Sequence, residues 1–150
     1  MNSIFERTTI DQFTERLNEL TPYSKPEWGK MTVYQMLKHC TENEKMNLRI
    51  TTYKRLLPGR LFGRMVMNKI IKDDLPMSKN NPTHPALKIK GDGDFETQRK
   101  ELINLLNKYP SSSKKELERL IHPFFGKLKL HEWEIYIYKH LDHHLRQFGV

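Results

Sequence analysis

The chain has 150 residues, of which 37% are hydrophobic and 29% are charged, and its formal net charge at pH 7 is +8. This length and composition fit one soluble globular domain over residues 1–150, and the single cysteine, Cys40, excludes an intramolecular disulfide. The sequence lacks a signal-peptide pattern and the roughly 20 consecutive apolar residues of a membrane span, so we expect a cytoplasmic protein with no membrane partner.

The first two helices are predicted from apolar spacing and from a capping motif. In residues 9–20, apolar side chains recur at spacings of three and four, which predicts an amphipathic helix. Two prolines and a glycine in residues 21–29 break it. Thr32 and Gln35 have the spacing of a capping box, so a second helix should begin there and run to about residue 48.

A third helix is predicted for residues 60–71, inside a strongly basic segment. We define the basic segment as residues 45–72, which contain eight lysines and arginines and no acid. Such a segment could attract nucleic acid, an anionic membrane surface or an acidic small substrate. Apolar residues are interleaved with the basic ones, and we favour an amphipathic helix with its apolar side inward and a solvated basic face. Without a recognised nucleic-acid motif, nucleic-acid binding is not expected.

The second half of the chain should contain a long loop and two further principal helices. Residues 73–92 are rich in proline and asparagine and predict an irregular loop of a length that is often functional or mobile. Asp94 is the predicted N-cap of a helix over residues 95–109. The final helix should run over residues 131–148 and end at Gly149. We therefore predict an all-α, antiparallel four-helix bundle with short extra helices.

The final helix carries His140 and His144, four residues apart. A helix turns about 100° per residue, so the two rings share one face and can chelate one metal ion. His39, at the edge of the apolar stripe of the second helix, is the natural third ligand. Three imidazoles leave coordination positions open and suit zinc, nickel, iron or copper. We predict a divalent metal site, zinc or nickel, at these three histidines; the alternative is that they lie at a polar end of the core and bond to water.

The other polar residues near these histidines give weaker signals. His84, in the long loop, and His122 could approach an open site, although ordinary loop histidines are favoured. His143 projects about 60° off the ligand face and should hydrogen-bond at the edge of the bundle. Asp142 points nearly opposite to the ligand face and should be solvated.

Other chemistries find little support in the sequence. Cys40 lies about 100° around the helix from His39, within the apolar stripe, and we favour a buried, inert thiol. No glycine-rich phosphate loop, Gly-x-Ser-x-Gly or Cys-x-x-Cys is present. The general acid or base, if there is one, cannot be assigned from spacing.

Several segments resemble the DinB-like (YfiT-like) superfamily of helical-bundle proteins, in a branch of uncharacterised function. They are residues 28–39 (WGKMTVYQMLKH), residues 122–128 (HPFFGKL), Glu132 with Trp133, and residues 138–149 (YKHLDHHLRQFG). The resemblance covers most of the chain from Thr21 onward and is weaker over the basic segment and the long loop. One departure is Lys129-Leu130, where this branch tends to have Thr-Pro, and it affects the expected helix start only.

The resemblance implies an up-down-down-up bundle with a metal ion held by His39, His140 and His144. Relatives include transferases and isomerases that use low-molecular-weight thiols, and metal-dependent hydrolases. It therefore implies a metal-dependent enzyme, a thiol-dependent transferase or a hydrolase, acting on a small molecule such as a thiol. Arg60 or Arg64 could then bind an anionic substrate, and a homodimer would be unsurprising. The alternative is a non-catalytic binding or stress-response module stabilised by the metal.

Overall fold

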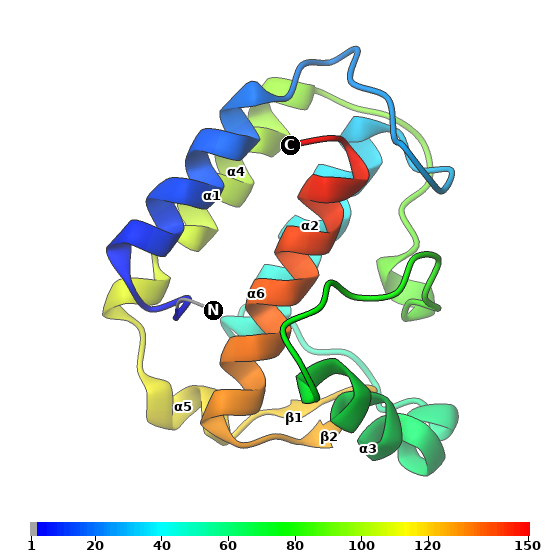
Figure 1. Ribbon diagram of the computed structural model, residues 1–150, viewed down its shortest axis with the longest axis vertical. Coiled ribbons are helices and arrows are strands. Elements are labelled where there is room, and N and C mark those ends of the chain that lie inside the picture. The colour runs from blue at the N-terminus through cyan, green and yellow to red at the C-terminus, as the bar shows by residue number, and fades with distance from the viewer. Residues whose placement is uncertain (1–2) are drawn as a thin grey trace.

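The computed structural model describes residues 3–150 (Figure 1). These residues form six α-helices, two 3₁₀ helices and a two-stranded sheet, joined by loops. In chain order they are α1 (Arg7–Glu19), α2 (Val33–Asn47), α3 (Leu57–Ile71), η1 (Pro85–Leu87), α4 (Phe95–Leu106), η2 (Tyr109–Ser111), α5 (Lys114–Glu118), β1 (Ile121–His122), β2 (Gly126–Lys127) and α6 (Leu130–Gln147). The protein is therefore mostly helical, which confirms the broad prediction of fold class.

The predicted helix signals are present. Thr32 Oγ1 accepts the N–H of Gln35 at 3.2 Å and the Gln35 side chain accepts the N–H of Thr32 at 3.0 Å, which completes the capping box of α2. Asp94 accepts the N–H of Thr97 at the start of α4. Gly149 follows α6 with a φ of +78°, a left-handed conformation that glycine adopts readily. Local capping chemistry thus sets these boundaries.

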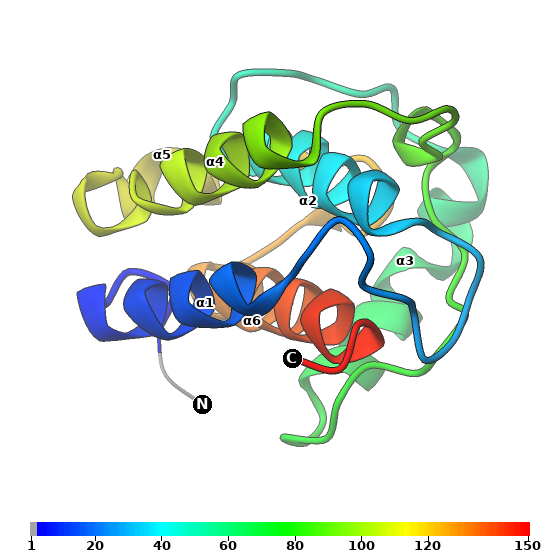
Figure 2. The same ribbon diagram turned by 90° about the horizontal axis from the view of Figure 1, so that it is seen from above.

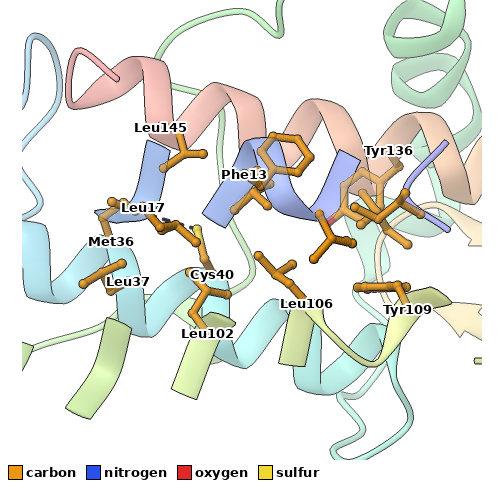
Figure 3. Packing of buried hydrophobic residues seen from close by; sticks show 14 of the residues in the cluster. Phe13, Leu17, Met36, Leu37, Cys40, Leu102, Leu106, Tyr109, Tyr136 and Leu145 are labelled. Carbon is orange, nitrogen blue, oxygen red and sulfur yellow. Dashed lines mark hydrogen bonds between the residues drawn. The ribbon is translucent and has the colours of Figure 1, made fainter. Parts of the chain in front are cut away.

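Four helices surround the main apolar core. Figure 2 shows α2 beside α4 in one layer and α1 beside α6 in the other. α2 packs most extensively on α4, and further contacts join α4 to α1, α1 to α6 and α6 to α2. The side chains buried between them include Phe13, Leu17, Met36, Leu102 and Leu145 (Figure 3). These contacts define a core enclosed by four helices. The more specific assignment, an antiparallel four-helix bundle, stays a prediction.

A short hairpin between α5 and α6 was not predicted. Ile121 pairs with Lys127 and His122 with Gly126 in antiparallel register. Two-residue strands are too short to show the alternation from which strands are read in a sequence. Gly126, with a φ of +80°, allows the tight turn. The hairpin supplies the surface on which α3 rests.

α3 packs on the hairpin through glycines. A Cβ at Gly59 would lie 2.5 Å from the Phe124 carbonyl oxygen, and one at Gly63 would lie 2.2 Å from it. Both glycines are buried, so the backbones of α3 and the hairpin are in close contact. The expectation that the apolar side of this helix turns inward is wrong for three residues, Leu61, Phe62 and Met65, which are exposed.

A buried polar network joins α2 to η2 and α6. Asn43 Nδ2 donates to the Tyr136 hydroxyl at 2.9 Å, and Asn47 Nδ2 donates to Asn43 Oδ1 at 3.0 Å. Asn47 and the Tyr109 hydroxyl also donate to the Glu44 carboxyl. Burial raises the pKa of Glu44 to about 7, although the hydrogen bonds from Tyr109 and Asn47 lower it. A carboxyl that titrates near neutral pH therefore lies within the core.

Replacing Gly63 with alanine should destabilise the protein, because the new Cβ would lie 2.2 Å from the backbone oxygen of Phe124. Overpacking costs about 1–3 kcal/mol, which outweighs the roughly 1 kcal/mol that alanine gains over glycine in a helix. Urea denaturation should therefore give a lower free energy of unfolding. Asn68→Ala, at an exposed position of α3, is the control and should not destabilise. Equal stabilities of Gly63→Ala and wild type would contradict the close packing.

The raised pKa of Glu44 predicts that stability falls as pH rises. The folded carboxyl has a pKa of about 7 and the ordinary value, expected in the unfolded chain, is 4.5, so between these values the folded state holds more protons. The contribution is full below the unfolded pKa and is lost as pH rises through the folded pKa. Between about pH 5 and about pH 8, ionisation of Glu44 should lower the free energy of unfolding of wild type by about 2–3 kcal/mol. Glu44→Gln cannot ionise and should lack this decrease.

Urea denaturation of wild type and Glu44→Gln at both pH values, with a chelator present, measures this effect. The histidines titrate in both proteins, so their contribution cancels in the difference between the two. The same pH dependence in both proteins would show that Glu44 does not ionise in this range.

Candidate metal centre

The structure brings His39, His140 and His144 together. His39 projects from the middle of α2, and the other two lie one turn apart on α6. One ring nitrogen from each lies within 4.8 Å of the other two. The three residues are only 3%, 8% and 7% exposed, respectively. The three histidines selected from the sequence therefore converge in a buried cluster that could hold a metal ion.

A backbone carbonyl from the long loop fixes the ring of His39. η1 places the Leu87 carbonyl oxygen 2.9 Å from His39 Nδ1. A carbonyl oxygen only accepts hydrogen bonds, so Nδ1 carries the proton and donates it. The lone pair of His39 is therefore on Nε2, which faces the other histidines. The buried side chain of Leu87 anchors this part of the loop.

A glutamine fixes the ring of His144 in the same way. Gln147 Nε2 donates to the Trp28 carbonyl oxygen at 2.8 Å, which leaves Gln147 Oε1 as the atom 2.9 Å from His144 Nδ1. An amide oxygen only accepts, so His144 also carries its proton on Nδ1. Its Nε2 is then the nitrogen with a lone pair, as in His39.

His140 completes the cluster through its Nε2 atom. This atom lies 3.2 Å from His39 Nε2. Because His39 Nε2 has a lone pair, His140 Nε2 carries the proton between them in the metal-free protein. His140 Nδ1 is buried and has no hydrogen-bond partner within residues 3–150. The three rings thus present two lone pairs and one exchangeable proton to a common centre.

One pair of ring nitrogens in the cluster has the spacing that an ion of the size of zinc requires, and all three nitrogens lie within 4.8 Å of one another. With metal–nitrogen distances of about 2.1 Å and tetrahedral angles, ligating nitrogens lie roughly 3.4 Å apart. The His39–His140 pair, at 3.2 Å, already has this spacing. Hydrogen bonds from the second ring nitrogen to carbonyl oxygens are also typical of histidines that bind metals. A metal bound at His140 Nε2 would require the proton of this neutral ring to be on Nδ1, so binding would shift a proton within the ring and release none.

Burial keeps the three imidazoles uncharged. It lowers the pKa of His39, an effect that the hydrogen bond to the Leu87 backbone partly offsets. It lowers the pKa of His140 and of His144 well below the usual value, and the neighbouring histidines lower both further. Neutral imidazole is the form that binds metals, so the three rings have the ligating charge state at neutral pH.

Two other histidines, His84 and His122, hydrogen-bond to loop backbone and not to the three rings, although His122 is near enough to His140 to lower its pKa. His84 Nε2 lies 3.1 Å from the Lys54 carbonyl oxygen and its Nδ1 accepts the N–H of Ala86, so both of its nitrogens are occupied. His122 Nδ1 accepts two backbone N–H groups of the β1–β2 turn, which places its proton on Nε2. Burial lowers the pKa of His122 to about 3. The structure therefore gives both residues roles in loop geometry.

Two neighbours of the cluster on α6 are also largely buried. His143 is 8% exposed and lies edge-on to the Trp28 ring, with 5.6 Å between the ring centroids. Asp142, predicted to be solvated, is 8% exposed instead. It pairs with Arg16 at 2.9 Å, because α1 lies along this side of α6, and with Arg146 of α6 itself at 2.7 Å.

The hydrogen-bond partners of the cluster were not predicted. Gln147 lies three residues after His144 on the same helix, a spacing at which side chains meet, so the sequence carried a usable signal. Leu87 acts through its backbone carbonyl, which every residue has. Only the fold of the long loop selects that carbonyl, so no pattern of residue types could have identified it.

Two further site expectations concern Cys40 and the arginines of α3. Burial raises the pKa of the Cys40 thiol well above its usual value, which agrees with an inert thiol. Arg64 pairs with Glu132. Glu132 lies eight residues before His140, which at about 1.5 Å per residue places it about 12 Å from His140 along α6. Arg64 is thus engaged away from the histidines, and nothing in the structure supports a substrate contact by it there.

The comparisons with known proteins assign a family. No curated protein and no solved structure matched the chain. Within residues 3–150, no helix combines the length and the apolar character needed to cross a membrane. A family model matches residues 6–149, nearly the whole chain.

The matching family is not the one that the sequence motifs resemble. No comparison links the chain to the DinB-like (YfiT-like) superfamily, so that assignment is corrected. The three histidines do not depend on it, since their spacing and their convergence were obtained from this chain alone. The chain belongs to the family described as "Protein of unknown function (DUF1569)".

Proposed function

We propose that the chain binds one divalent metal ion through the Nε2 atoms of His39, His140 and His144. The observation that carries the proposal is the hydrogen bonding of the rings: the carbonyl oxygens of Leu87 and Gln147 hold protons on Nδ1 and so direct lone pairs to one centre. The hydrogen bond from His140 to His39 satisfies one of these lone pairs, and a shared ion would satisfy both. Zinc and nickel both suit an all-imidazole ligand set.

We further propose that the metal serves an enzyme that acts on a small molecule, as a thiol-dependent transferase or a hydrolase. Three protein ligands leave at least one coordination position for water or substrate. A bound ion there lowers the pKa of a water or a substrate thiol and supplies a nucleophile near neutral pH. The part of the chain's own residues is to keep the rings neutral and to orient them.

A function of a different class is favoured by the depth of the cluster. The ligating residues are 3–8% exposed, and their contacts join α2, α6 and the long loop. A metal ion there would connect elements that lie far apart in the sequence. The alternative is therefore a non-catalytic binding or stress-response module that the ion stabilises.

The finer architecture proposed with these functions is an antiparallel bundle of α1, α2, α4 and α6. Its support is the closed series of contacts in which each of these helices packs on two others. The histidine cluster then lies where α2 faces α6. A cytoplasmic location and a homodimer are proposed with it, from the one free cysteine and from the frequency of two-fold dimers among oligomers.

Purified wild-type protein should contain one divalent ion per chain, and His140→Ala with His144→Ala should reduce the metal to background, because two of three ligands are lost. Elemental analysis measures both. His131→Ala, at an exposed histidine of α6, is the control and should retain the metal. Gln147→Met removes the acceptor that orients His144 and should weaken metal affinity about 10–100-fold. Metal-free wild type, or undiminished metal in the double variant, would overturn the site.

Chelation followed by thermal melting should distinguish a catalytic ion from a structural one. If the ion is catalytic, we expect the metal-free chain to keep its helical circular dichroism and to melt at a lower Tm, because a ligand of the folded state stabilises it by RT ln(1 + [L]/Kd). Restoring zinc or nickel should raise the Tm again. Loss of the helical signal on chelation, and its return with metal, would instead favour the structural module.

A further inference from the structure

α3 exposes an unusually apolar surface. We define the outer face of α3 as Leu57, Leu61, Phe62 and Met65, which are 70%, 71%, 52% and 65% exposed. α3 lies at the edge of the molecule in both ribbon views (Figures 1 and 2). Single exposed apolar residues are ordinary, but several on one helix that are rimmed by charge mark an interaction surface.

The packing of α3 fixes this face outward. Gly59 and Gly63 lie against the Phe124 backbone, where no larger residue fits, so the helix cannot rotate about its axis to bury another side. At about 100° per residue, Leu61 and Met65 project nearly opposite to these glycines. The end of α3 is also held, since Lys139 Nζ donates to its Ile70 carbonyl oxygen at 2.7 Å. The exposure is therefore a property of the fold.

The charge beside the outer face has one sign. By helical rotation, Arg60 lies on one flank of the row formed by Leu57, Leu61 and Met65. Lys69 lies on the other flank, between Met65 and Phe62. The basic segment contains no acid, and the nearest acids that follow are at residues 73–74, beyond the end of the helix. Arg64 is engaged with Glu132 of α6. The apolar stripe therefore has cationic side chains on both flanks.

A bilayer that contains anionic lipids matches this combination. Two copies of the same face would bring uncompensated cations together, which disfavours self-association. A lipid surface instead offers an apolar interior to the stripe and phosphates to the flanks. The outer face is formed by α3 alone, so no second element beside it forms a groove. A convex surface of this kind suits a flat partner.

We propose that the outer face of α3 binds peripherally to membranes that contain anionic lipids. Leu57, Leu61 and Met65 enter the interfacial region, while Arg60 and Lys69 contact lipid phosphates. The proposal concerns attachment to a surface only, since no helix of residues 3–150 is suited to cross a bilayer. It is independent of the metal site, because none of these residues contacts the histidine cluster.

Sedimentation with lipid vesicles tests the proposal on the full chain. Wild type should pellet at low salt with phosphatidylcholine vesicles that contain about 30% phosphatidylglycerol, and it should remain in solution with phosphatidylcholine alone. Leu61→Ser with Met65→Ser keeps the charge and should lower the partition coefficient at least about tenfold. Tyr23→Ser, at a residue 88% exposed in another part of the molecule, is the matched control and should bind like wild type.

The cationic flanks are tested separately. Arg60→Gln with Lys69→Gln should lower the partition coefficient about 25-fold at low salt, at about fivefold per charge, and the difference should shrink as salt screens it. Circular dichroism establishes that each variant is folded. Absence of wild-type binding, equal binding to neutral vesicles, or unchanged binding of the serine variant would overturn the proposal. So would sedimentation velocity that shows a wild-type dimer and a monomeric serine variant, because the face would then be a self-interface.

Discussion

The arrangement of α2, α6 and the long loop depends on the burial of three neutral imidazoles that face one another. A buried imidazole is costly unless its nitrogens have partners. The Leu87 carbonyl and the Gln147 amide satisfy the outer nitrogens of His39 and His144. These bonds leave the inner nitrogens turned toward each other, an arrangement to which a shared cation could bind. The long loop is thus held on the core at Leu87, because the buried His39 ring needs the Leu87 carbonyl oxygen as its hydrogen-bond acceptor.

The surface between α2 and α6 is polar over several turns. His39 and Asn43 are four residues apart on α2, as are Tyr136 and His140 on α6, and Asn43 donates to the Tyr136 hydroxyl in the layer beside the histidines. Apolar packing is provided mainly where α1 and α4 complete the core. Hydrogen bonds specify partners and distances more narrowly than apolar contact does, so this polar layer fixes how α2 meets α6 and, with that, the geometry of the cluster.

Local rules predicted much of the fold because they act between residues close in sequence. The Thr32–Gln35 box and Gly149 need only their neighbours, and the spacing of His140 and His144 needs only the helical repeat. The orientation of α3 could not be obtained in this way, because periodicity identifies a face but not its partner. Gly59 and Gly63 determine which side of α3 faces the protein, because only glycine allows the Phe124 backbone to approach so closely. This contact is known only from the position of the hairpin.

α6 connects the two regions to which we assign roles, the histidine cluster and α3. Lys139, next to His140, is buried and donates to the backbone at the end of α3, where a cation is favoured by the helix dipole. A change in α6 that disturbs the histidines can therefore also loosen α3. The outer face of α3 is different, since its residues project into solvent and their replacement leaves this connection intact. The separation of the two proposed roles is thus set by burial: the histidine cluster belongs to the core and the outer face of α3 to the surface.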